Sequence, residues 1–269
     1  MIINNKEDLH ITLIQSDIYW EDPEKNLDSA GKLLGDLKEK TDMIILPEMF
    51  NTGFSMNLGK CAETMTGKTL AFLKEKASEV NSMIIGSLLI TEGGMNYNRL
   101  VAVSPDGSVV QYNKRHLFRL SEEYKTLSAG NKKVIVNCNG WKILPLVCYD
   151  LRFPVWSKNR YINQEYDYDL LVYVANWPKS RAAIWRSLLV ARAVENQCYV
   201  IGVNRIGRDG QGTAHAGGSL IAGPDGEILA SAPMEKPGVL TEVLSIAKLR
   251  EFRTTFPFAP DWDHFIIHP

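Results

Sequence analysis

The chain has 269 residues, 45% of them hydrophobic and 23% charged, which is typical of a globular protein with one large domain or two small ones. Its formal net charge is −1 and no basic stripe or tail occurs, so nucleic acid is not an expected partner. No segment approaches the length of a membrane span, and residues 1–8 lack the apolar core of a signal peptide, so a membrane is not expected either.

Strand-like and helix-like segments alternate from end to end. Asp22-Pro23 is typical of a helix start, an N-cap followed by proline, and apolar residues then recur at helical spacing. Asn139-Gly140 indicates a tight hairpin. In chain order the predicted strands are 9–15, 43–46, 82–90, 97–104, 108–114, 133–138, 141–148, 169–175, 198–203, 218–222, 227–232 and 239–243. The predicted helices begin after Asp22, after Thr66 and at about Pro154, and cover residues 181–197 and about 245–252.

Two Pro-Asp-Gly turns, at 105–107 and 224–226, each join two predicted strands, which hints at pseudo-symmetry between the halves of the chain. No proline- or serine-rich linker and no low-complexity block divides the chain. The alternation of elements therefore favours a single α/β domain of residues 1–269, with mixed sheets and helices outside. Its last segment, residues 253–269, is rich in aromatic side chains and is predicted to dock as a tail.

The four cysteines, at positions 61, 138, 148 and 198, form no CxxC pair and no pattern with the spacing of zinc ligands. We therefore expect a cytoplasmic protein with reduced thiols, and neither a metal nor another cofactor. Small, buried apolar side chains are the usual role of cysteine, and this interpretation suits Cys61, Cys138 and Cys198.

Cys148 is different, because it ends the apolar run 143–147 and is followed at once by a turn and a predicted helix. This pattern predicts a buried strand that delivers a thiol to a strand end. Near the positive end of a helix the thiolate is favoured, so Cys148 is the candidate nucleophile of an enzyme.

Three candidate residues lie at equivalent places in the predicted fold, because each follows or ends a predicted strand: Glu48, Lys114 and Cys148. Strand ends are where active sites of layered α/β proteins gather. A carboxylate could take the thiol proton, the thiolate could attack a carbonyl-type carbon, and the ammonium could stabilise the oxyanion. In isolation, Glu48 could merely cap a loop and Lys114 could be a solvated charge.

The blocks around these residues resemble the three signature blocks of the nitrilase superfamily of carbon–nitrogen hydrolases, in the family's order and over nearly the whole chain. The blocks are Leu46-Pro47-Glu48-Met49, Tyr112-Asn113-Lys114-Arg115-His116-Leu117-Phe118 and Val147-Cys148-Tyr149-Asp150-Leu151-Arg152-Phe153-Pro154. Within the superfamily the chain is most similar to bacterial omega-amidases, through residues 147–156, 175–178 and 191–197.

The resemblance implies an αββα sandwich of two mixed sheets that forms a homodimer or higher homo-oligomer through helices. It also implies that Glu48 is the general base, Lys114 the oxyanion stabiliser and Cys148 the nucleophile, with the Tyr149 backbone N–H as second oxyanion donor. A second glutamate is expected after the lysine block, where Glu123 fits best, although Glu122 is adjacent.

Omega-amidases hydrolyse the terminal amide of 2-oxoglutaramate and 2-oxosuccinamate, small molecules whose other end is anionic. A planar guanidinium suits a carboxylate, so Arg152 and Arg181 are candidates for that contact. Phe118 and Trp177 could form the walls of the pocket. Purely structural roles remain open for these residues: an ion pair of Arg152 with Asp150 or Glu195, a surface position for Arg181, and a core position for Trp177.

Three rival functions stay open. Another branch of the superfamily, such as a carbamoylase or a nitrilase, would use the same nucleophile. A non-catalytic binding subunit would keep the fold without turnover. A redox-sensing thiol would need a partner for Cys148, and Cys138, across the Asn139-Gly140 turn, is the candidate. A Cys–His pair with His116 is not expected, because His116 lies in the lysine block, two residues past Lys114.

Overall fold

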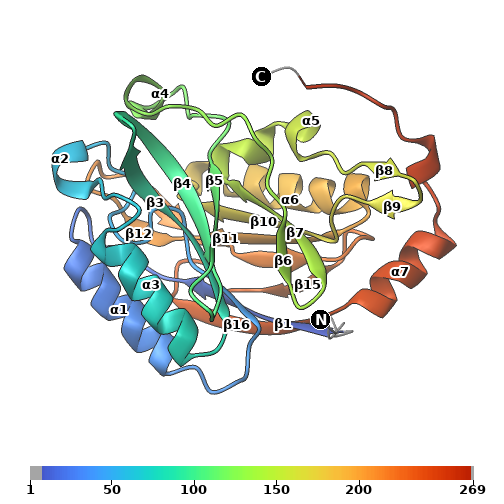
Figure 1. The fold of residues 1–269 in the computed structure, drawn as a ribbon, viewed down its shortest axis with the longest axis horizontal. Coiled ribbons are helices and arrows are strands. Elements are labelled where there is room, and N and C mark those ends of the chain that lie inside the picture. Colours follow the sequence, from blue (N-terminus) through green and yellow to red (C-terminus); the bar gives the residue numbers. More distant parts are fainter. Residues whose placement is uncertain (1–7, 268–269) are drawn as a thin grey trace.

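The computed structural model describes residues 8–267. Two six-stranded mixed sheets lie face to face, with the longer helices outside them (Figure 1). The predicted α/β sandwich is thus confirmed. Among the residues described, no helix is both long and apolar enough to cross a bilayer.

The first sheet combines a parallel centre with antiparallel edges. The strands β1, β2 and β3 run parallel, and the other neighbours are antiparallel. In spatial order the strands are β16 (Gly238–Ser245), β1 (Asp8–Gln15), β2 (Met43–Ile45), β3 (Met83–Glu92), β4 (Met95–Val103) and β5 (Val109–Asn113). The helices α1 (Pro23–Gly35) and α3 (Lys68–Glu79) contact each other outside this sheet (Figure 1).

The second sheet has the same mixture, with β7, β10 and β11 parallel. In spatial order its strands are β6 (Val136–Cys138), β7 (Trp141–Val147), β10 (Leu170–Ala175), β11 (Tyr199–Asn204), β14 (Leu220–Ala222) and β15 (Ile228–Ser231). The helix α6 (Ala182–Asn196) contacts β11 and β14, and so covers the outer face.

The two sheets are related by pseudo-symmetry, as the paired turns suggest. Read from β16 and from β6, both sheets show the same succession of antiparallel and parallel neighbours. The two Pro-Asp-Gly turns join equivalent pairs, β4 to β5 and β14 to β15. Gly107 and Gly226 have φ of 79° and 87°, a left-handed conformation that glycine adopts without steric cost.

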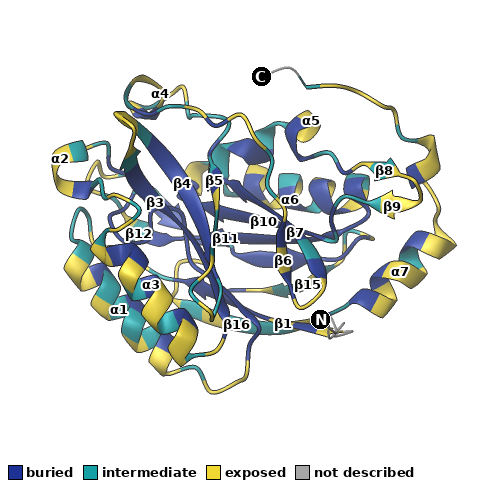
Figure 2. Cartoon of the chain, in the orientation of Figure 1, coloured by how far each residue is buried: buried dark blue, intermediate teal, exposed yellow. Residues whose placement is uncertain are grey.

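Side-chain alternation along the strands separates two apolar layers. Ile11 and Leu13 of β1 belong to the core between the sheets, which also contains Ile143 of β7. Ile14 belongs instead to the layer beneath α1 and α3, with Leu34. The central strands are accordingly buried on both faces, whereas the helices expose one side (Figure 2).

Short elements account for the differences from the predicted pattern. The helix predicted from Pro154 is a single turn, α5 (Pro154–Ser157), and it follows a 3₁₀ turn at Cys148–Arg152. Further single turns are α2 (Leu58–Cys61) and α4 (Glu123–Thr126). Two small hairpins escaped prediction, β8 (Tyr161–Ile162) with β9 (Glu165–Tyr166), and β12 (Ile206–Arg208) with β13 (Ala214–Ala216).

The predicted tail, residues 253–269, includes the end of a helix. Residues 253–255 form the last turn of α7 (Ile246–Thr255), where Arg253 binds Asp169 at 2.9 Å. Beyond the helix, Trp262 lies under Nζ of Lys158, 3.6 Å from the ring centroid, while Phe258 is 55% exposed. The remaining parts of the predicted domain and tail, residues 1–7 and 268–269, lie outside the described residues.

Candidate active site

Glu48 lies just beyond β2, in a turn whose backbone is fixed from the neighbouring strand. The N–H of Met49, which has a φ of 44°, donates to Oγ of Ser87 on β3 at 2.9 Å. The Glu48 side chain is fully buried. Its Oε2 accepts from the backbone N–H of Asn176 at 2.8 Å, at the end of β10. Because β10 is the pseudo-symmetric counterpart of β2, the two strand ends meet at this carboxylate.

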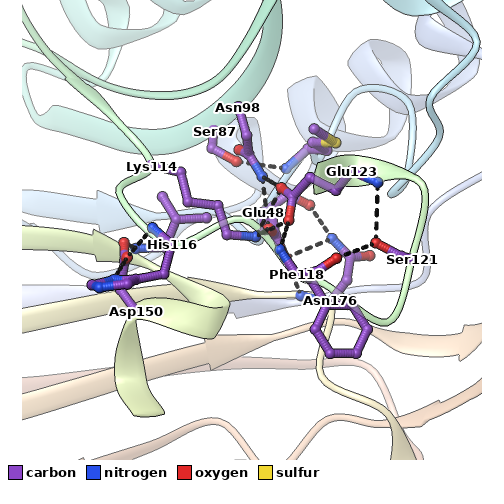
Figure 3. Close-up of polar contacts among 12 residues, drawn as sticks. Glu48, Ser87, Asn98, Lys114, His116, Phe118, Ser121, Glu123, Asp150 and Asn176 are labelled. Carbon is purple, nitrogen blue, oxygen red and sulfur yellow. Dashed lines mark hydrogen bonds and ion pairs between the residues drawn. The ribbon is translucent and has the colours of Figure 1, made fainter. Parts of the chain in front are cut away.

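Lys114 follows β5, and its ammonium lies between two buried carboxylates (Figure 3). Nζ is 2.9 Å from Oε1 of Glu48 and 2.9 Å from each carboxylate oxygen of Glu123. Glu123 also accepts from the backbone N–H of Phe118 at 2.6 Å. Glu122 is exposed and pairs with Lys125. The structure therefore brings Glu123, and not Glu122, to the lysine.

The charge states of this cluster follow from burial and proximity. Burial alone would lower the pKa of Lys114, but the carboxylates of Glu123 and Glu48 outweigh it, and the pKa is raised. The lysine is therefore a permanent cation. Burial raises the pKa of Glu123, and the charge of Lys114 only partly opposes this effect. The ammonium of Lys114 thus contacts two buried carboxyl groups at once.

Cys148 lies in a strained turn at the end of β7. Its φ of 43° is a left-handed conformation that residues with a side chain rarely adopt. The turn is fastened by the buried carboxylate of Asp150, whose Oδ2 accepts from the N–H of Val147 at 3.1 Å and from the hydroxyl of Tyr112 at 2.8 Å. His116 also binds Asp150, at 2.8 Å, and its ring stacks on Phe153.

The expected stabilisation of a Cys148 thiolate by a helix is not found. The helix after it has only one turn, and the thiol, though partly exposed to a cavity, lies below the protein surface. Burial raises the pKa of Cys148, the charge of Glu48 raises it further, and the charge of Lys114 opposes both. The resting thiol is therefore protonated at neutral pH, and its reaction needs a base.

A cavity of about 300 Å³ unites most of the predicted residues. Glu48, Lys114 and Cys148 line it, and all five predicted substrate-binding residues do so too: Phe118, Tyr149, Arg152, Trp177 and Arg181. Glu123 is not in the wall, because it sits behind Lys114. A larger cleft of about 590 Å³ beside Trp20 contains none of the predicted site residues.

The two cavity arginines lie over aromatic rings rather than beside carboxylates. The guanidinium carbon of Arg152 is 4.9 Å from the Trp177 ring centroid, and that of Arg181 is 5.4 Å from the Phe118 centroid. Within residues 8–267 neither makes an ion pair; Asp150 and Glu195, the alternatives for Arg152, bind other groups. Trp177 is 3% exposed, so it is both a core residue and a cavity wall.

Three polar residues of the site are not among those predicted, although Asn176 lies in the segment 175–178 that resembles omega-amidases. Asn176 donates to Glu48, Asn98 on β4 contacts both glutamates, and His215 on β13 lines the cavity. Asn98 lies inside an apolar strand pattern, and His215 lies in the unpredicted hairpin. Only the turn-forming residues Asp209-Gly210-Gln211-Gly212 could have indicated that hairpin. No group of three or more His, Cys, Asp or Glu side chains in the described part of the chain could hold a metal ion.

The structure also tests the redox pairing of Cys138 with Cys148. Cys138 pairs with Trp141 at the start of β7, whereas Cys148 lies just past its far end. At a rise of about 3.3 Å per residue, the two cysteines lie roughly 20 Å apart, well beyond the reach of a disulfide. Among residues 8–267 no two cysteines are joined by a disulfide.

The two-sheet sandwich and the cavity with its thiol, carboxylate and ammonium are features of a class of hydrolases. Comparison with known proteins identifies the family. The family model described as carbon-nitrogen hydrolase matches residues 10–254. The chain belongs to this family. It is 44% identical to the omega-amidase YafV of Escherichia coli K12, over 96% of this chain and 98% of that protein. It is 32% identical to the 2-oxoglutaramate amidase of Bacillus subtilis, over 93% and 96% of the two chains.

Solved structures agree. A CN-hydrolase superfamily protein of Xanthomonas campestris, with an arsenic adduct in its active site, superposes with a TM-score of 0.95 at 41% identity, covering 98% of this chain and all of the other. Yeast Nit3, a member of the nitrilase superfamily, shares the fold with a TM-score of 0.82 at 23% identity, covering 96% and 97%. The sequence-based assignment to the superfamily is confirmed.

Proposed function

We propose that the chain is an omega-amidase, which hydrolyses the terminal amide of a 2-oxo-dicarboxylic acid monoamide such as 2-oxoglutaramate or 2-oxosuccinamate to the acid and ammonia. The observation that carries this proposal is the composition of one cavity. A thiol, a buried carboxylate and an ammonium line it, together with two guanidiniums that have no carboxylate partner in the described chain. The similarity to omega-amidases supports the same substrate class.

The proposed cycle uses the residues in the cavity wall. Glu48 takes the thiol proton while the sulfur of Cys148 adds to the amide carbon, and the raised pKa of the thiol makes this base necessary. The oxyanion is stabilised by the ammonium of Lys114 and by the backbone N–H of Tyr149. Glu48 then gives the proton to the nitrogen, ammonia leaves, and a thioester remains.

Hydrolysis of the thioester repeats these steps with water. Glu48 deprotonates the water, whose oxygen adds to the thioester carbon. The carbon–sulfur bond then breaks, the acid is released, and the proton on Glu48 returns to Cys148. In this scheme Glu123 does not touch the substrate. Its carboxylate holds the Lys114 ammonium in place.

The carboxylate at the other end of the substrate is proposed to bind Arg152 or Arg181. A guanidinium binds a carboxylate through two parallel hydrogen bonds, and both arginines are already oriented by an aromatic ring. The Phe118 and Trp177 rings then enclose the short chain between the carboxylate and the amide. A cavity of about 300 Å³ suits such a small substrate.

An ammonia-release assay with 2-oxoglutaramate, run beside Cys148→Ala, tests the proposal. We expect ammonia from the wild-type chain and none from the variant. Release from a nitrile or an N-carbamoyl amino acid, but not from 2-oxoglutaramate, would favour another branch of the family. A binding subunit would show no turnover, and intact-mass analysis would detect no acyl adduct on Cys148.

We also propose that the chain is one domain that forms a homodimer in the cytoplasm. Val155 on α5 and Ile184 and Val194 on α6 are 55%, 41% and 48% exposed, which gives the outer helices an apolar surface for a second copy. A thiol nucleophile works only in its reduced form, which a cytoplasmic location maintains. Light scattering after gel filtration tests the dimer, and a monomer mass at micromolar concentration would reject it.

A further inference from the structure

Asn98 connects the two carboxylates of the site. It lies on β4, is fully buried, and directs its side-chain amide at both glutamates (Figure 3). Its Nδ2 is 2.8 Å from Oε1 of Glu48 and 3.0 Å from Oε1 of Glu123. The two N–H groups of one amide therefore serve two carboxylates, and the ammonium of Lys114 contacts the same pair.

The charges that surround the Asn98 amide give this side chain an electrostatic role in addition to its packing. Two carboxylates and one ammonium leave a net negative charge without access to bulk water, and buried charges of this kind need hydrogen-bond donors. The orientation of the amide is fixed chemically, because the reverse orientation would direct Oδ1 at two anions. The hydrogen bond from Asn98 also lowers the pKa of Glu123, against the larger effect of burial.

The two oxygens of Glu48 have different neighbours. Oε1 accepts from Asn98 and Lys114, whereas Oε2 accepts from the backbone N–H of Asn176. Both oxygens of Glu48 are thus held by donors, Oε1 by Asn98 and Lys114 and Oε2 by the backbone and side-chain N–H groups of Asn176. Glu48, Asn176 and Cys148 line the same cavity, so the carboxylate held by these donors faces the space that contains the thiol.

We propose that Asn98 is a positioning residue: by donating one N–H to each glutamate, it stabilises both carboxylates beside a single ammonium and holds Glu48 in the orientation in which it serves Cys148 as base. This inference rests on the proposed role of Glu48 as base. Asn98 does not line the cavity, so it acts on the reaction through Glu48 and does not contact the substrate.

The decisive variant is Asn98→Ala, which removes the amide but keeps the backbone carbonyl that accepts from the Lys114 N–H at 2.9 Å. The first readout is the rate of Cys148 alkylation by iodoacetamide as a function of pH, followed by intact mass. The groups that face Glu48 are Lys114, Glu123, Cys148 and His215. Without the amide, the charged carboxylates lose a donor, so the acid limb of the profile should move up by about one pH unit.

The second readout is turnover of 2-oxoglutaramate. We expect kcat to fall at least about tenfold, because a misplaced base transfers protons slowly, with KM within about twofold of wild type. Asn159→Ala is the matched control, since Asn159 is a buried asparagine that binds only structural groups. It should lower stability and leave the pH profile unchanged.

A folded Asn98→Ala with the wild-type acid limb and kcat would overturn the proposal. So would a loss that Asn159→Ala reproduces. If the alanine variant does not fold, Asn98→Ser, which keeps one donor, should show a smaller shift in the same direction, and no shift would again reject the idea. Alkylation needs no amide substrate, so an inactive wild type with a shifted acid limb in the variant would contradict the omega-amidase proposal alone.

Discussion

The ammonium of Lys114 lies 2.9 Å from Oε1 of Glu48, although 66 positions separate the two residues along the chain. Glu48 follows β2 and Lys114 follows β5, with β3 and β4 between these strands in the sheet. The pair therefore forms only once four strands are in register. Both groups are fully buried, so their geometry and charge depend on the whole sheet edge rather than on local sequence.

Replacing Lys114 with alanine should abolish turnover. Losing one oxyanion donor typically raises the barrier by ~3–4 kcal/mol, a rate loss of roughly 100-fold or more. The change also leaves Glu48 and Glu123 buried without a counter-charge, which typically costs about 3–5 kcal/mol of folding free energy. Ammonia release and urea unfolding measure the two effects. Lys125→Ala, an exposed lysine paired with Glu122, is the control and should change neither. Near wild-type rates in Lys114→Ala would contradict the role of this ammonium.

Glu48→Gln should separate thiol reactivity from turnover. The charge of Glu48 raises the pKa of the Cys148 thiol, so a neutral glutamine lets the thiolate form at lower pH than the charged glutamate would allow. Glutamine cannot accept the thiol proton or return it to the leaving nitrogen, so amide hydrolysis should fall by about 100-fold or more.

Alkylation of Cys148 checks this interpretation. The acid limb of the alkylation profile should lie at lower pH in the glutamine variant than in the wild type, because the charge that raises the pKa of the Cys148 thiol is gone. Substantial hydrolysis by Glu48→Gln, or an unchanged acid limb, would assign the base to another group.

Arg152→Met and Arg181→Met should identify the contact to the substrate carboxylate. Losing a charge-assisted hydrogen bond costs about 1.5–3 kcal/mol, so KM for 2-oxoglutaramate should rise by roughly tenfold or more in at least one variant. A simple amide without a carboxylate should be little affected. Arg186→Met, at an exposed position of α6, is the matched control. An unchanged KM in both cavity variants would remove these arginines from substrate binding.

The sequence predicts the sheet system well because periodicity and turn chemistry are local signals. Asn139-Gly140 does join β6 to β7, and the two Pro-Asp-Gly turns occupy equivalent places in the two sheets. The strand ends that carry Glu48, Lys114 and Cys148 also meet at one cavity. The segment after Cys148 is less predictable, because a proline at 154 suits both a long helix and the single turn of α5.

Contacts between distant strands are beyond such reasoning. Asn98 resembles any polar residue in a buried strand until β4 pairs between β3 and β5 and brings its amide to two carboxylates. The predicted direction of the thiol pKa is wrong for the same reason. A helix start after Cys148 is visible in sequence, whereas burial and the charge of Glu48 arise only in the folded chain.

His215 should make folding stability sensitive to acid. It is 5% exposed, and burial, with a further contribution from the charge of Arg205, lowers its pKa from 6.5 to about 4. On acidification, His215 of the unfolded chain therefore binds a proton near pH 6.5, whereas His215 of the folded chain binds it only near pH 4. The free energy of unfolding therefore decreases as the pH falls through this window. The full effect on the free energy of unfolding is about 3 kcal/mol.

Urea unfolding at pH 7 and pH 4.5 should show a smaller loss of stability for His215→Gln than for the wild type. The control is His10→Gln, at an exposed position, which should behave as the wild type. Equal losses in all three proteins would show that His215 does not remain neutral in the folded chain.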